Sequence, residues 1–420
     1  MLWAYNLLLF PFRALPPLLE ATAGKSPDAV REWGERRARR LPESLAGGVW
    51  IHGASVGEAR IVTLVAAALR AGRPALPLAA SAITRTGRGQ LPSPPSVNAA
   101  FYAPLDFKGL PARVLDSLRP RALVLVETEL WPNLLHEAFR RGVPVAVING
   151  RLAPERMTRY RGLRGLFGPI LAGLDRVGAQ SPDEAERFVE LGVRREALTV
   201  TGNVKYDLPV PAVTEAALRE RFGVPSGRPV VLAGSTGPGE EALVLDAFAA
   251  ARKEHPSLYL VLAPRHPERV PGVEAELAAR GLGFHRLSAG ADAEAGKADG
   301  LLVDVMGRLA SLYAMAAAAF VGGSLVPIGG HNVLEPAAAG TPVLFGPHTH
   351  HVTEPAEALL AAGGAIRVPS PAALAEAWKL LVRDRGERER IAAAAAGVVR
   401  ANRGALERTV ALVLSLLERR

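Results

Sequence analysis

Two series of short apolar runs, each ending in a glycine-rich turn, limit the folds that this chain can adopt. In the first series the run at 49–52 ends in the turn 53–57, and Glu58 then opens a helical pattern. The second series starts with the run at 230–233 and the turn 234–239. Strands and helices that alternate at this length predict parallel sheets covered by helices on both faces. We therefore expect an α/β fold with two Rossmann-like domains facing across a cleft.

The same kind of apolar run, bounded by glycine, proline or polar residues, predicts further strands in both series. In chain order these strands lie at about 76–80, 100–102, 122–126, 143–148, 258–262, 301–305, 316–321 and 343–345. The candidate functional residues fall where strands end, which is where open α/β sheets bind their ligands.

The length of 420 residues exceeds that of one usual domain, so two domains are expected. We interpret residues 202–207, with Pro209 and Pro211, as the linker between them. The predicted parts are an N-terminal segment at 1–20, a first Rossmann-like domain at 21–205, a second at 206–390, and a C-terminal helix at 391–420 that packs back on the first domain.

The N-terminal segment is apolar but interrupted. Asn6, Pro11 and Arg13 break a stretch that is already short of the roughly 20 apolar residues a spanning helix needs. A basic start and a small-residue cleavage site, the marks of a secretory signal peptide, are both missing. Trp3 and Tyr5 suit the headgroup level of a bilayer. We predict a membrane anchor or interfacial segment, the alternative being an apolar helix packed on the first domain.

Charge and cysteine content narrow the possible partners and chemistry. The chain holds 50 Lys and Arg against 41 Asp and Glu, a net charge of +9, and no cysteine. A basic surface favours anionic partners such as nucleic acid, acidic lipid headgroups or phosphorylated substrates, although a GC-rich genome or heat adaptation would also enrich arginine. Without cysteine, disulfides, thiolate catalysis and cysteine zinc sites are excluded.

Acidic side chains follow the strands of the first series. Glu58 lies at a helix N-terminus behind the turn residues Ser55 and Gly57, where the helix dipole favours an ionised carboxylate. Such a group can take the proton of an acceptor hydroxyl as that hydroxyl attacks an anomeric carbon. Glu127 and Glu129 are predicted to share one strand face near a ligand, with Glu127 as the functional residue. Dipole compensation and turn capping are the structural alternatives.

A run of arginines predicts an anion-binding patch on the first domain. Its members are Arg151, Arg156, Arg159, Arg161 and Arg164, with Glu155 as the one acidic residue among them. The patch could face lipid phosphates, or it could be a solvated helix face.

Residues after two strands of the second series predict a phosphate site. Ser235 and Thr236 would supply hydroxyl and backbone donors, and Arg265 and His266 lie in a motif whose guanidinium forks match phosphate oxygens. A surface ion pair is the alternative for Arg265.

The stretch 321–347 places polar side chains between two glycine-rich turns. Gly330 and Asn332 precede a predicted helix whose backbone N–H groups point above the sheet. Glu335, in that helix, suits two neighbouring ribose hydroxyls, because a carboxylate accepts hydrogen bonds and repels anions. We predict a nucleotide site here, with a glycine-rich strand-to-helix connection as the alternative.

Several familiar motifs are missing from the sequence. It contains no Gly-x-x-x-x-Gly-Lys-Ser/Thr phosphate loop, no dinucleotide fingerprint, no His-Glu-x-x-His and no metal-binding Asp-x-Asp. A reaction without a metal or cofactor is favoured, in which helix ends and arginines stabilise a leaving phosphate.

Six motifs follow one another along the chain: HGASVGE at 52–58, VETELWPN at 126–133, NGRL at 149–152, TGNVKYD at 201–207, PRHPER at 264–269 and GGSLVPIGGHNVLEPAAAGTPVLFGP at 322–347. In this order they resemble the 3-deoxy-D-manno-octulosonic acid (Kdo) transferases of lipopolysaccharide synthesis. The resemblance spans nearly the whole chain, including the apolar N-terminus.

This resemblance implies a B-type glycosyltransferase fold, CMP-Kdo as donor, and a lipid A precursor as acceptor at the cytoplasmic face of the inner membrane. It implies that Glu58 is the general base, that Glu127 is a second essential acid, and that transfer inverts the anomeric carbon without a metal. No nucleic acid is expected as a partner. The residues on its nucleotide motifs are Arg265, Met306, Gly307, Asn332 and Glu335.

The sequence departs from the family pattern at three positions. Arg308 stands where an acidic residue is common, and Val333 and Arg85 stand where proline is common. We expect transfer to require that the carboxylates of Glu58 and Glu335 face each other across one groove. The alternatives are another nucleotide-sugar enzyme of this fold, such as an epimerase, or a basic peripheral membrane protein without catalysis.

Overall fold

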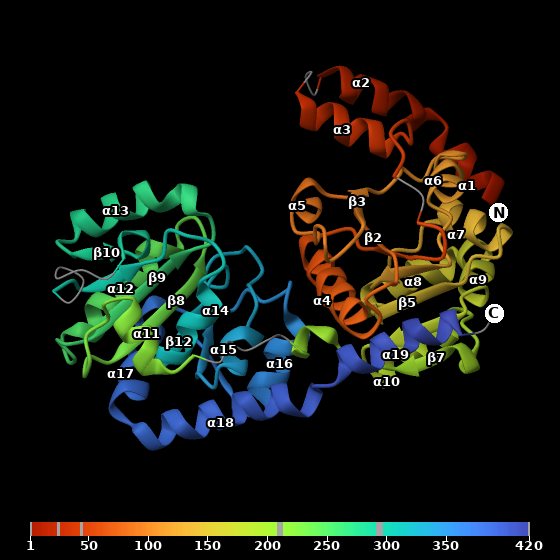
Figure 1. Cartoon of the computed structure of the whole chain (residues 1–420). Coiled ribbons are helices and arrows are strands. Elements are labelled where there is room, and N and C mark those ends of the chain that lie inside the picture. Colours follow the sequence, from red (N-terminus) through yellow and green to blue (C-terminus); the bar gives the residue numbers. More distant parts are fainter. Residues whose placement is uncertain (1, 23–25, 43–44, 208–212, 291–296, 419–420) are drawn as a thin grey trace. The chain divides into compact units, whose positions relative to one another are not determined.

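The chain forms two compact units in the computed structural model, which describes residues 2–22, 26–42, 45–207, 213–290 and 297–418. Unit 1 comprises Met1–Asp207 with Arg403–Arg420, and unit 2 comprises Leu208–Asn402 (Figure 1). Each unit holds one parallel sheet of seven strands. The predicted α/β fold with two Rossmann-like domains is confirmed. Pro209 and Pro211 of the predicted linker lie outside the described residues.

The sheet of unit 1 has the order β3-β2-β1-β4-β5-β6-β7, and all its neighbours are parallel. Its strands are Val49–His52 (β1), Leu78–Ala82 (β2), Ala99–Tyr102 (β3), Ala122–Val126 (β4), Val145–Gly150 (β5), Arg176–Ala179 (β6) and Leu198–Val200 (β7). Every residue of β1, β2, β4 and β5 is buried. These strands are apolar runs without alternation because helices cover both faces.

The helices of unit 1 begin at residues that suit helix N-termini. Ser55 and Ser181 cap α4 and α10 through their side chains, and proline occupies the first turn of several others. The helices are Leu2–Leu9 (α1), Pro11–Ala14 (η1), Leu15–Thr22 (α2), Pro27–Arg36 (α3), Val56–Gly72 (α4), Arg85–Arg88 (α5), Leu110–Leu118 (α6), Pro132–Arg140 (α7), Pro154–Gly162 (α8), Arg164–Ala172 (α9), Pro182–Leu191 (α10), Arg195–Ala197 (η2), Val204–Asp207 (η3) and Ala405–Leu417 (α19).

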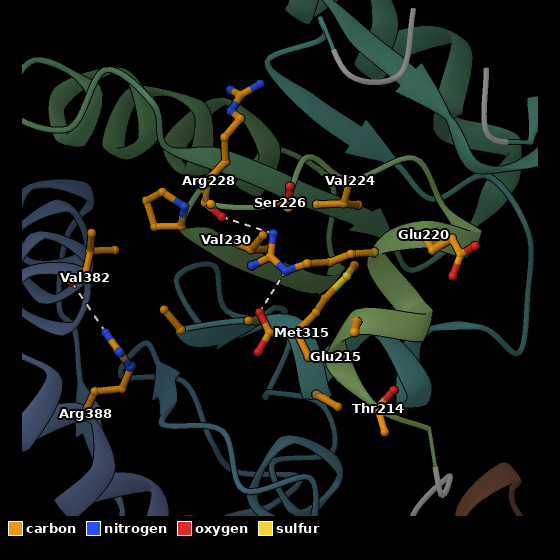
Figure 2. A pocket seen from close by; sticks show the side chains of 17 residues that line it. Thr214, Glu215, Glu220, Val224, Ser226, Arg228, Val230, Met315, Val382 and Arg388 are labelled. Carbon is orange, nitrogen blue, oxygen red and sulfur yellow. Dashed lines mark hydrogen bonds and ion pairs between the residues drawn. The ribbon is translucent and has the colours of Figure 1, made fainter. Parts of the chain in front are cut away.

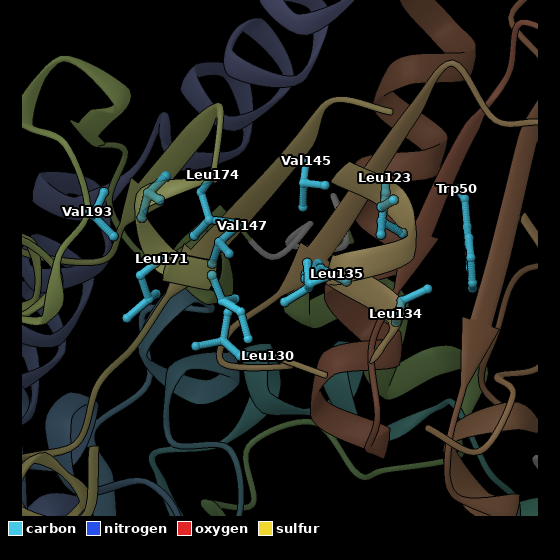
Figure 3. Packing of buried hydrophobic residues seen from close by; sticks show 14 of the residues in the cluster. Trp50, Leu123, Leu130, Leu134, Leu135, Val145, Val147, Leu171, Leu174 and Val193 are labelled. Atoms are coloured by element: carbon cyan, nitrogen blue, oxygen red, sulfur yellow. The ribbon is translucent and has the colours of Figure 1, made fainter. Parts of the chain in front are cut away.

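Two apolar cores lie on the two faces of this sheet, because successive strand residues point to opposite sides. Trp50 belongs to one core and its neighbour Ile51 to the other. Figure 3 shows the first core, where Leu134 and Leu135 of α7 pack with Trp50 and Leu123. The second core is closed by side chains of α4 and α19. Burial on both faces fixes the strand ends that carry the site.

The sheet of unit 2 has the order β10-β11-β9-β8-β12-β13-β14, again with parallel neighbours. Its strands are Val230–Thr236 (β8), Tyr259–Pro264 (β9), Phe284–Arg286 (β10), Gly300–Leu302 (β11), Ala318–Val321 (β12), Val343–Phe345 (β13) and Ala365–Arg367 (β14). The strand predicted at 301–305 is shorter than expected and ends at Leu302.

Helices cover both faces of this second sheet. Buried side chains of α12 and α17 pack on one face, and those of α11 and η6 on the other. The helices are Glu215–Arg221 (α11), Glu240–Arg252 (α12), Pro267–Arg269 (η4), Val270–Ala279 (α13), Leu287–Ala289 (η5), Leu309–Leu312 (α14), Tyr313–Met315 (η6), Leu334–Ala338 (α15), Thr353–Ala361 (α16), Pro371–Arg383 (α17) and Arg385–Asn402 (α18).

Two predictions about the chain's connections are wrong. Residues 202–207 are not a linker but a packed part of unit 1, in which Val204 and Tyr206 are buried. The single long helix expected near the C-terminus is two helices, α18 and α19, separated at Gly404, where φ is +86°. Asp207 accepts the backbone N–H groups of Gly404 and Leu406 at 2.8 and 2.6 Å. These bonds fix the start of α19 in unit 1.

Helix α1 is attached to unit 1 through polar side chains. The Tyr5 hydroxyl donates to Asp106 Oδ2 at 3.0 Å, and the Asn6 and Asn133 amides bond to each other at 3.0 Å. Exposed apolar side chains of this N-terminal region are Trp3, Leu7, Leu8, Phe10, Phe12, Leu15 and Leu19. In the described part of the chain, no helix has both the length and the apolar character needed to cross a bilayer.

Candidate active site

Glu58 lies in the first turn of α4, directly after the carboxyl end of β1. Its Oε2 accepts the backbone N–H of Ala54 at 2.7 Å, and its Oε1 accepts the hydroxyl of Ser55 at 2.8 Å. The residue is 9% exposed, and its neighbour Gly57 is exposed. The turn therefore holds the carboxylate in one orientation at the edge of the sheet.

Burial and hydrogen bonding act in opposite directions on this carboxylate. Burial raises the pKa of Glu58, and the nearby charge of Glu127 raises it further. The bonds from Ala54 and Ser55 and the charge of Lys205 lower that pKa, but the net shift is upward. We expected the helix N-terminus to favour the ionised form, and loss of solvent outweighs that effect. A carboxylate with a raised pKa is a stronger base.

Glu127 follows β4 in a left-handed conformation, with φ of +58°. The chain leaves the strand at Val126, so the prediction that Glu127 and Glu129 share a strand face is wrong. Glu127 Oε1 accepts from Lys205 Nζ at 2.8 Å. This ion pair joins the end of β4 to the segment after β7, which sequence analysis had interpreted as a linker.

Glu129 is the more perturbed of the two acids. Its Oε2 accepts the indole N–H of Trp131 at 2.8 Å and lies 3.9 Å from His52 Nε2. Burial, followed by the charge of Glu58, raises the pKa of Glu129 to about 7. At neutral pH this carboxyl is therefore protonated about half of the time. The sequence pattern predicts Glu127 as the functional residue and does not indicate the raised pKa of Glu129.

Three buried side chains, Trp50, Ser81 and His52, are linked by hydrogen bonds next to Glu129. Trp50 Nε1 donates to Ser81 Oγ at 2.7 Å, and Ser81 Oγ lies 2.9 Å from His52 Nδ1. Burial lowers the pKa of His52 to about 4, which keeps the ring neutral. The buried Nε2 of His52 faces Glu129 and has no hydrogen-bond partner among the described residues.

The arginines of the predicted anion-binding patch differ in their exposure and in their partners. Arg156 and Arg159 are exposed on α8, and the charge of Arg156 acts on Glu129 by lowering its pKa. Arg151 follows β5 and is half-buried, its backbone carbonyl accepting from a threonine hydroxyl. Arg161 forms two bonds of 2.5 and 3.1 Å to Glu190. Its charge is therefore balanced from α10, which the local sequence could not indicate.

The carboxyl edge of the sheet in unit 2 is organised by a fully buried carboxylate, Glu240. Its two oxygens accept four backbone N–H groups. The donors are Gly237 at 3.0 Å, Gly323 at 2.6 Å, Ser324 at 3.0 Å and Leu325 at 2.8 Å. Glu240 thus ties the turn after β8 to the loop after β12. The local sequence gave no sign of this role, because three of the four donors come from the distant loop after β12.

The predicted phosphate residues after β8 and β9 differ in their surroundings. The Thr236 hydroxyl is buried and donates to Glu241 Oε1 at 2.9 Å, and Arg269 forms two bonds of 2.6 and 2.8 Å to the same carboxylate. Ser235 is half-buried in a left-handed conformation, with φ of +59°. The backbone N–H of Arg265 donates to the Thr236 carbonyl at 3.0 Å, which brings the two strand ends together.

The remaining nucleotide candidates lie in neighbouring loops of unit 2. His266 is exposed, with Nδ1 3.5 Å from Glu268. Met306 is 61% exposed and, with Gly307, follows the short strand β11. The backbone N–H of Gly330 donates to the Gly323 carbonyl at 2.7 Å.

Asn332 orients Glu335 at the start of α15. The Asn332 amide donates from Nδ2 to Glu335 Oε1 at 3.1 Å, and its Oδ1 accepts the backbone N–H of Leu334 at 3.0 Å. The helix has five residues and Glu335 is its second, so the carboxylate lies in the first turn.

Comparisons with known proteins decide the family. A family model described as 3-deoxy-D-manno-octulosonic-acid transferase (kdotransferase) matches residues 31–208. The 3-deoxy-D-manno-octulosonic acid transferase of Bordetella pertussis is 38% identical over 392 residues, which cover 89% of each chain. The chain belongs to the Kdo transferase family. It is therefore a glycosyltransferase, and the resemblance found in the sequence is confirmed.

Solved structures show the same fold at low sequence identity. A glycosyltransferase from Rickettsia africae aligns with a TM-score of 0.58 at 14% identity, over 89% of this chain and 98% of that one. A UDP-GlcNAc 2-epimerase from Neisseria meningitidis aligns with a TM-score of 0.57 at 14% identity, over 88% and 100%. Kdo transferases thus share their architecture with enzymes of different chemistry.

One cavity of this Kdo transferase lies in unit 2, at the amino edge of its sheet. It measures about 1030 Å³ and is lined by residues at the amino ends of β8 and β12, such as Val230 and Met315 (Figure 2). Its arginines already donate to backbone carbonyls, as Arg388 does to Val382 at 3.4 Å. In open α/β sheets the ligand binds at the opposite, carboxyl edge.

Within the described residues, no three His, Asp or Glu side chains are grouped so that they could hold a metal ion.

Proposed function

We propose that this Kdo transferase moves Kdo from CMP-Kdo to a lipid A precursor at the cytoplasmic face of the inner membrane. In this proposal the transfer inverts the anomeric carbon in one displacement and uses neither metal nor cofactor. It acts in lipopolysaccharide synthesis, as its family does.

The reaction needs one proton acceptor and one stabilised leaving group. The acceptor hydroxyl gives its proton to a Glu58 oxygen while the hydroxyl oxygen bonds to the anomeric carbon of Kdo. The bond from that carbon to the phosphate oxygen breaks at the same time, and CMP leaves with the electron pair. Attack from the face opposite the leaving group inverts the configuration.

The geometry of Glu58 is the observation that carries this proposal. Two hydrogen bonds, from Ala54 and Ser55, hold its carboxylate at the carboxyl edge of the sheet, and burial raises its pKa. Both features suit a general base, which needs a fixed orientation and a proton affinity closer to the working pH. Glu127 forms an ion pair with Lys205, and the two charges act in opposite directions on the pKa of Glu58.

For the donor we assign the carboxyl edge of unit 2. Glu335, oriented by Asn332, would accept hydrogen bonds from the two ribose hydroxyls. Arg265, with His266 and Ser235, would hold the phosphate through charged and hydroxyl donors. Gly330, Met306 and Gly307 would line the nucleotide, and Thr236 would act by holding the turn, since its hydroxyl already bonds to Glu241.

Exposed apolar side chains of α1 and α2 support the membrane part of the proposal. Trp3 and Leu8 are each 73% exposed, while Tyr5 and Asn6 of the same helix bond to unit 1. A helix whose polar side chains hold the protein and whose apolar ones face outward can enter the headgroup layer of a bilayer.

The direct test is product analysis by mass spectrometry. Protein incubated with CMP-Kdo and a lipid A precursor should yield a lipid heavier by one or more Kdo residues, together with CMP. Calorimetry should show binding of CMP and none of UDP. Absence of the heavier lipid, with UDP bound in preference to CMP, would indicate a different nucleotide-sugar reaction.

A further inference from the structure

A second cavity lies in unit 1, between α3 and the short helix α5. It measures about 400 Å³, and its walls include Arg31 and Glu32 of α3, Arg85 and Arg88 of α5, and Tyr102 at the end of β3. Figure 1 shows α3 beside α2, with β3 and α5 on its other side. None of the residues assigned above to the reaction or to the donor lines this cavity.

Positive charge exceeds negative charge around this cavity. Glu32 is shared by two arginines, since it accepts Nε of Arg36 at 3.0 Å and Nε of Arg85 at 2.6 Å. Arg85 uses its Nε for this pair, and its side chain remains 66% exposed. Arg31 is exposed and Asp28 is the other acid of the lining. The surplus of guanidinium groups favours an anion.

Arg88 offers a donor that lacks an acceptor. Its Nη2 donates to the Ala100 carbonyl at 2.6 Å and its guanidinium lies 5.9 Å from the ring centre of Tyr102. Its Nε is buried and has no hydrogen-bond partner in the described part of the protein. A buried N–H without an acceptor is unfavourable, so a turn of the Arg88 side chain that brings this group to a ligand oxygen in the cavity would be stabilising.

The cavity also lies next to the turn that holds Glu58. The backbone N–H and the hydroxyl of Thr84, the residue before α5, donate to the Ala54 carbonyl at 3.0 and 3.1 Å. Ala54 in turn donates to Glu58. On the other side, α3 is joined to α2 by the ion pair of Arg37 with Glu20 at 2.6 Å. The cavity thus lies between the exposed apolar helices and the proposed base.

We propose that this cavity binds a phosphate group of the lipid acceptor through Arg31, Arg85 and Arg88. The inference rests on the proposed function, because it assigns a subsite to that acceptor. A tetrahedral phosphate presents oxygens in several directions, so guanidinium forks from α3 and α5 can bind it together. Its position beside the Glu58 turn would set which acceptor hydroxyl reaches the base.

The test compares two double variants with equal loss of charge. Arg31→Gln with Arg85→Gln removes two exposed cations from the cavity. The control, Arg113→Gln with Arg140→Gln, removes two exposed cations elsewhere in unit 1, one of them also paired with a glutamate. Each protein is assayed with a phosphorylated lipid A precursor and with the same lipid after enzymatic removal of its phosphates.

We expect the cavity variant to raise the KM for the phosphorylated lipid at least tenfold, with the KM for CMP-Kdo unchanged. The wild type and the control should prefer the phosphorylated lipid, whereas the cavity variant should show the same kcat/KM for both lipids. If the wild type transfers Kdo and the cavity variant keeps the preference, the inference is wrong. If the wild type transfers nothing, the proposed function itself has failed.

A vesicle assay separates the acceptor from ordinary membrane lipid. Vesicles of phosphatidylcholine with phosphatidylglycerol, without acceptor, should bind the cavity variant and the control equally. Weaker binding of the cavity variant alone, with its lipid preference retained, would assign the cavity to phospholipid headgroups and overturn the proposal.

Discussion

Glu58 in unit 1 and Glu240 in unit 2 occupy equivalent places in their sheets. Each lies at the start of the helix that follows the first strand of its unit, β1 or β8. Glu240 is fully buried and accepts four backbone N–H groups. Glu58 is 9% exposed and accepts one backbone N–H and one hydroxyl.

The difference lies in how much of each carboxylate the protein already uses. A carboxylate can accept about four hydrogen bonds, and those of Glu240 are filled by the loops it fastens. Glu58 retains lone pairs, and its pKa is raised because burial outweighs its few donors. The same residue in the same place is thus a structural tie in one unit and a candidate base in the other.

The largest expected effect comes from Glu58→Gln. The amide keeps the shape of the side chain but cannot take a proton, so kcat should fall by about 10³ to 10⁴-fold. This corresponds to about 4–5.5 kcal/mol of activation free energy. The measurement is Kdo transfer under saturating substrates, with CMP binding followed by calorimetry.

A matched control for this variant is Glu155→Gln, which removes an exposed acid from the first turn of α8. Its kcat should stay within about twofold of the wild type. If the Glu58→Gln variant kept its turnover, Glu58 would not be the general base, and its proposed difference in function from Glu240 would be wrong.

Glu240→Gln should act on stability rather than on the chemical step. The amide replaces an acceptor oxygen by an NH₂ group that faces backbone donors, and we expect a loss of about 3–4 kcal/mol in the free energy of unfolding. Urea unfolding and CMP affinity should both weaken. Glu254→Gln, which changes an exposed acid paired with Lys379, should leave the urea midpoint almost unchanged, because solvent screens an exposed ion pair. If the two variants changed stability equally, Glu240 would not stabilise the protein by joining its two loops.

Glu129 predicts a pH dependence of stability in unit 1. Because folding raises its pKa from 4.5 to about 7, the ionised form is disfavoured in the folded state. The stabilisation linked to its proton is complete below pH 4.5 and is lost as the pH rises through 7. The shift corresponds to about 3–3.5 kcal/mol. Glu129→Gln should remove this part of the slope in urea unfolding between pH 5 and 8, and an unchanged slope would contradict the assignment.

The smallest effect is expected from Tyr5→Phe. Asp106 loses the Tyr5 hydroxyl but keeps the backbone donors Asn133 and Leu134 at 2.9 and 2.8 Å, so, like Glu240, it stays bonded to backbone N–H groups. We expect a local loss of about 1 kcal/mol. Faster hydrogen exchange in α1, with exchange in β4 unchanged, is the measurement. Unaltered exchange in α1 would show that this bond does not hold the helix.

Much of the fold was predictable from local sequence. The run 122–126 and the run 343–345 are strands at the predicted bounds, because an apolar run closed by polar or glycine residues has few other uses in an α/β protein. The errors fall where distant residues decide. Residues 202–207 were assigned to a linker, yet Tyr206 is buried and Asp207 holds the start of α19.

The residues of the candidate site were also predictable only in part. The sequence located Glu58, Glu127 and Glu335 at strand or helix ends, and their roles remain predictions. It did not identify Lys205 as the partner of Glu127, 78 residues away, or His52 behind Glu129.

By itself the sequence determined the two series of strands and helices, the acids at their ends, and the family. The tertiary structure decided which of those acids is already bonded and which keeps lone pairs and a raised pKa. The physical reason is that hydrogen-bond partners and loss of solvent come from segments far apart in the chain. Gly323, for example, reaches Glu240 from 83 residues away.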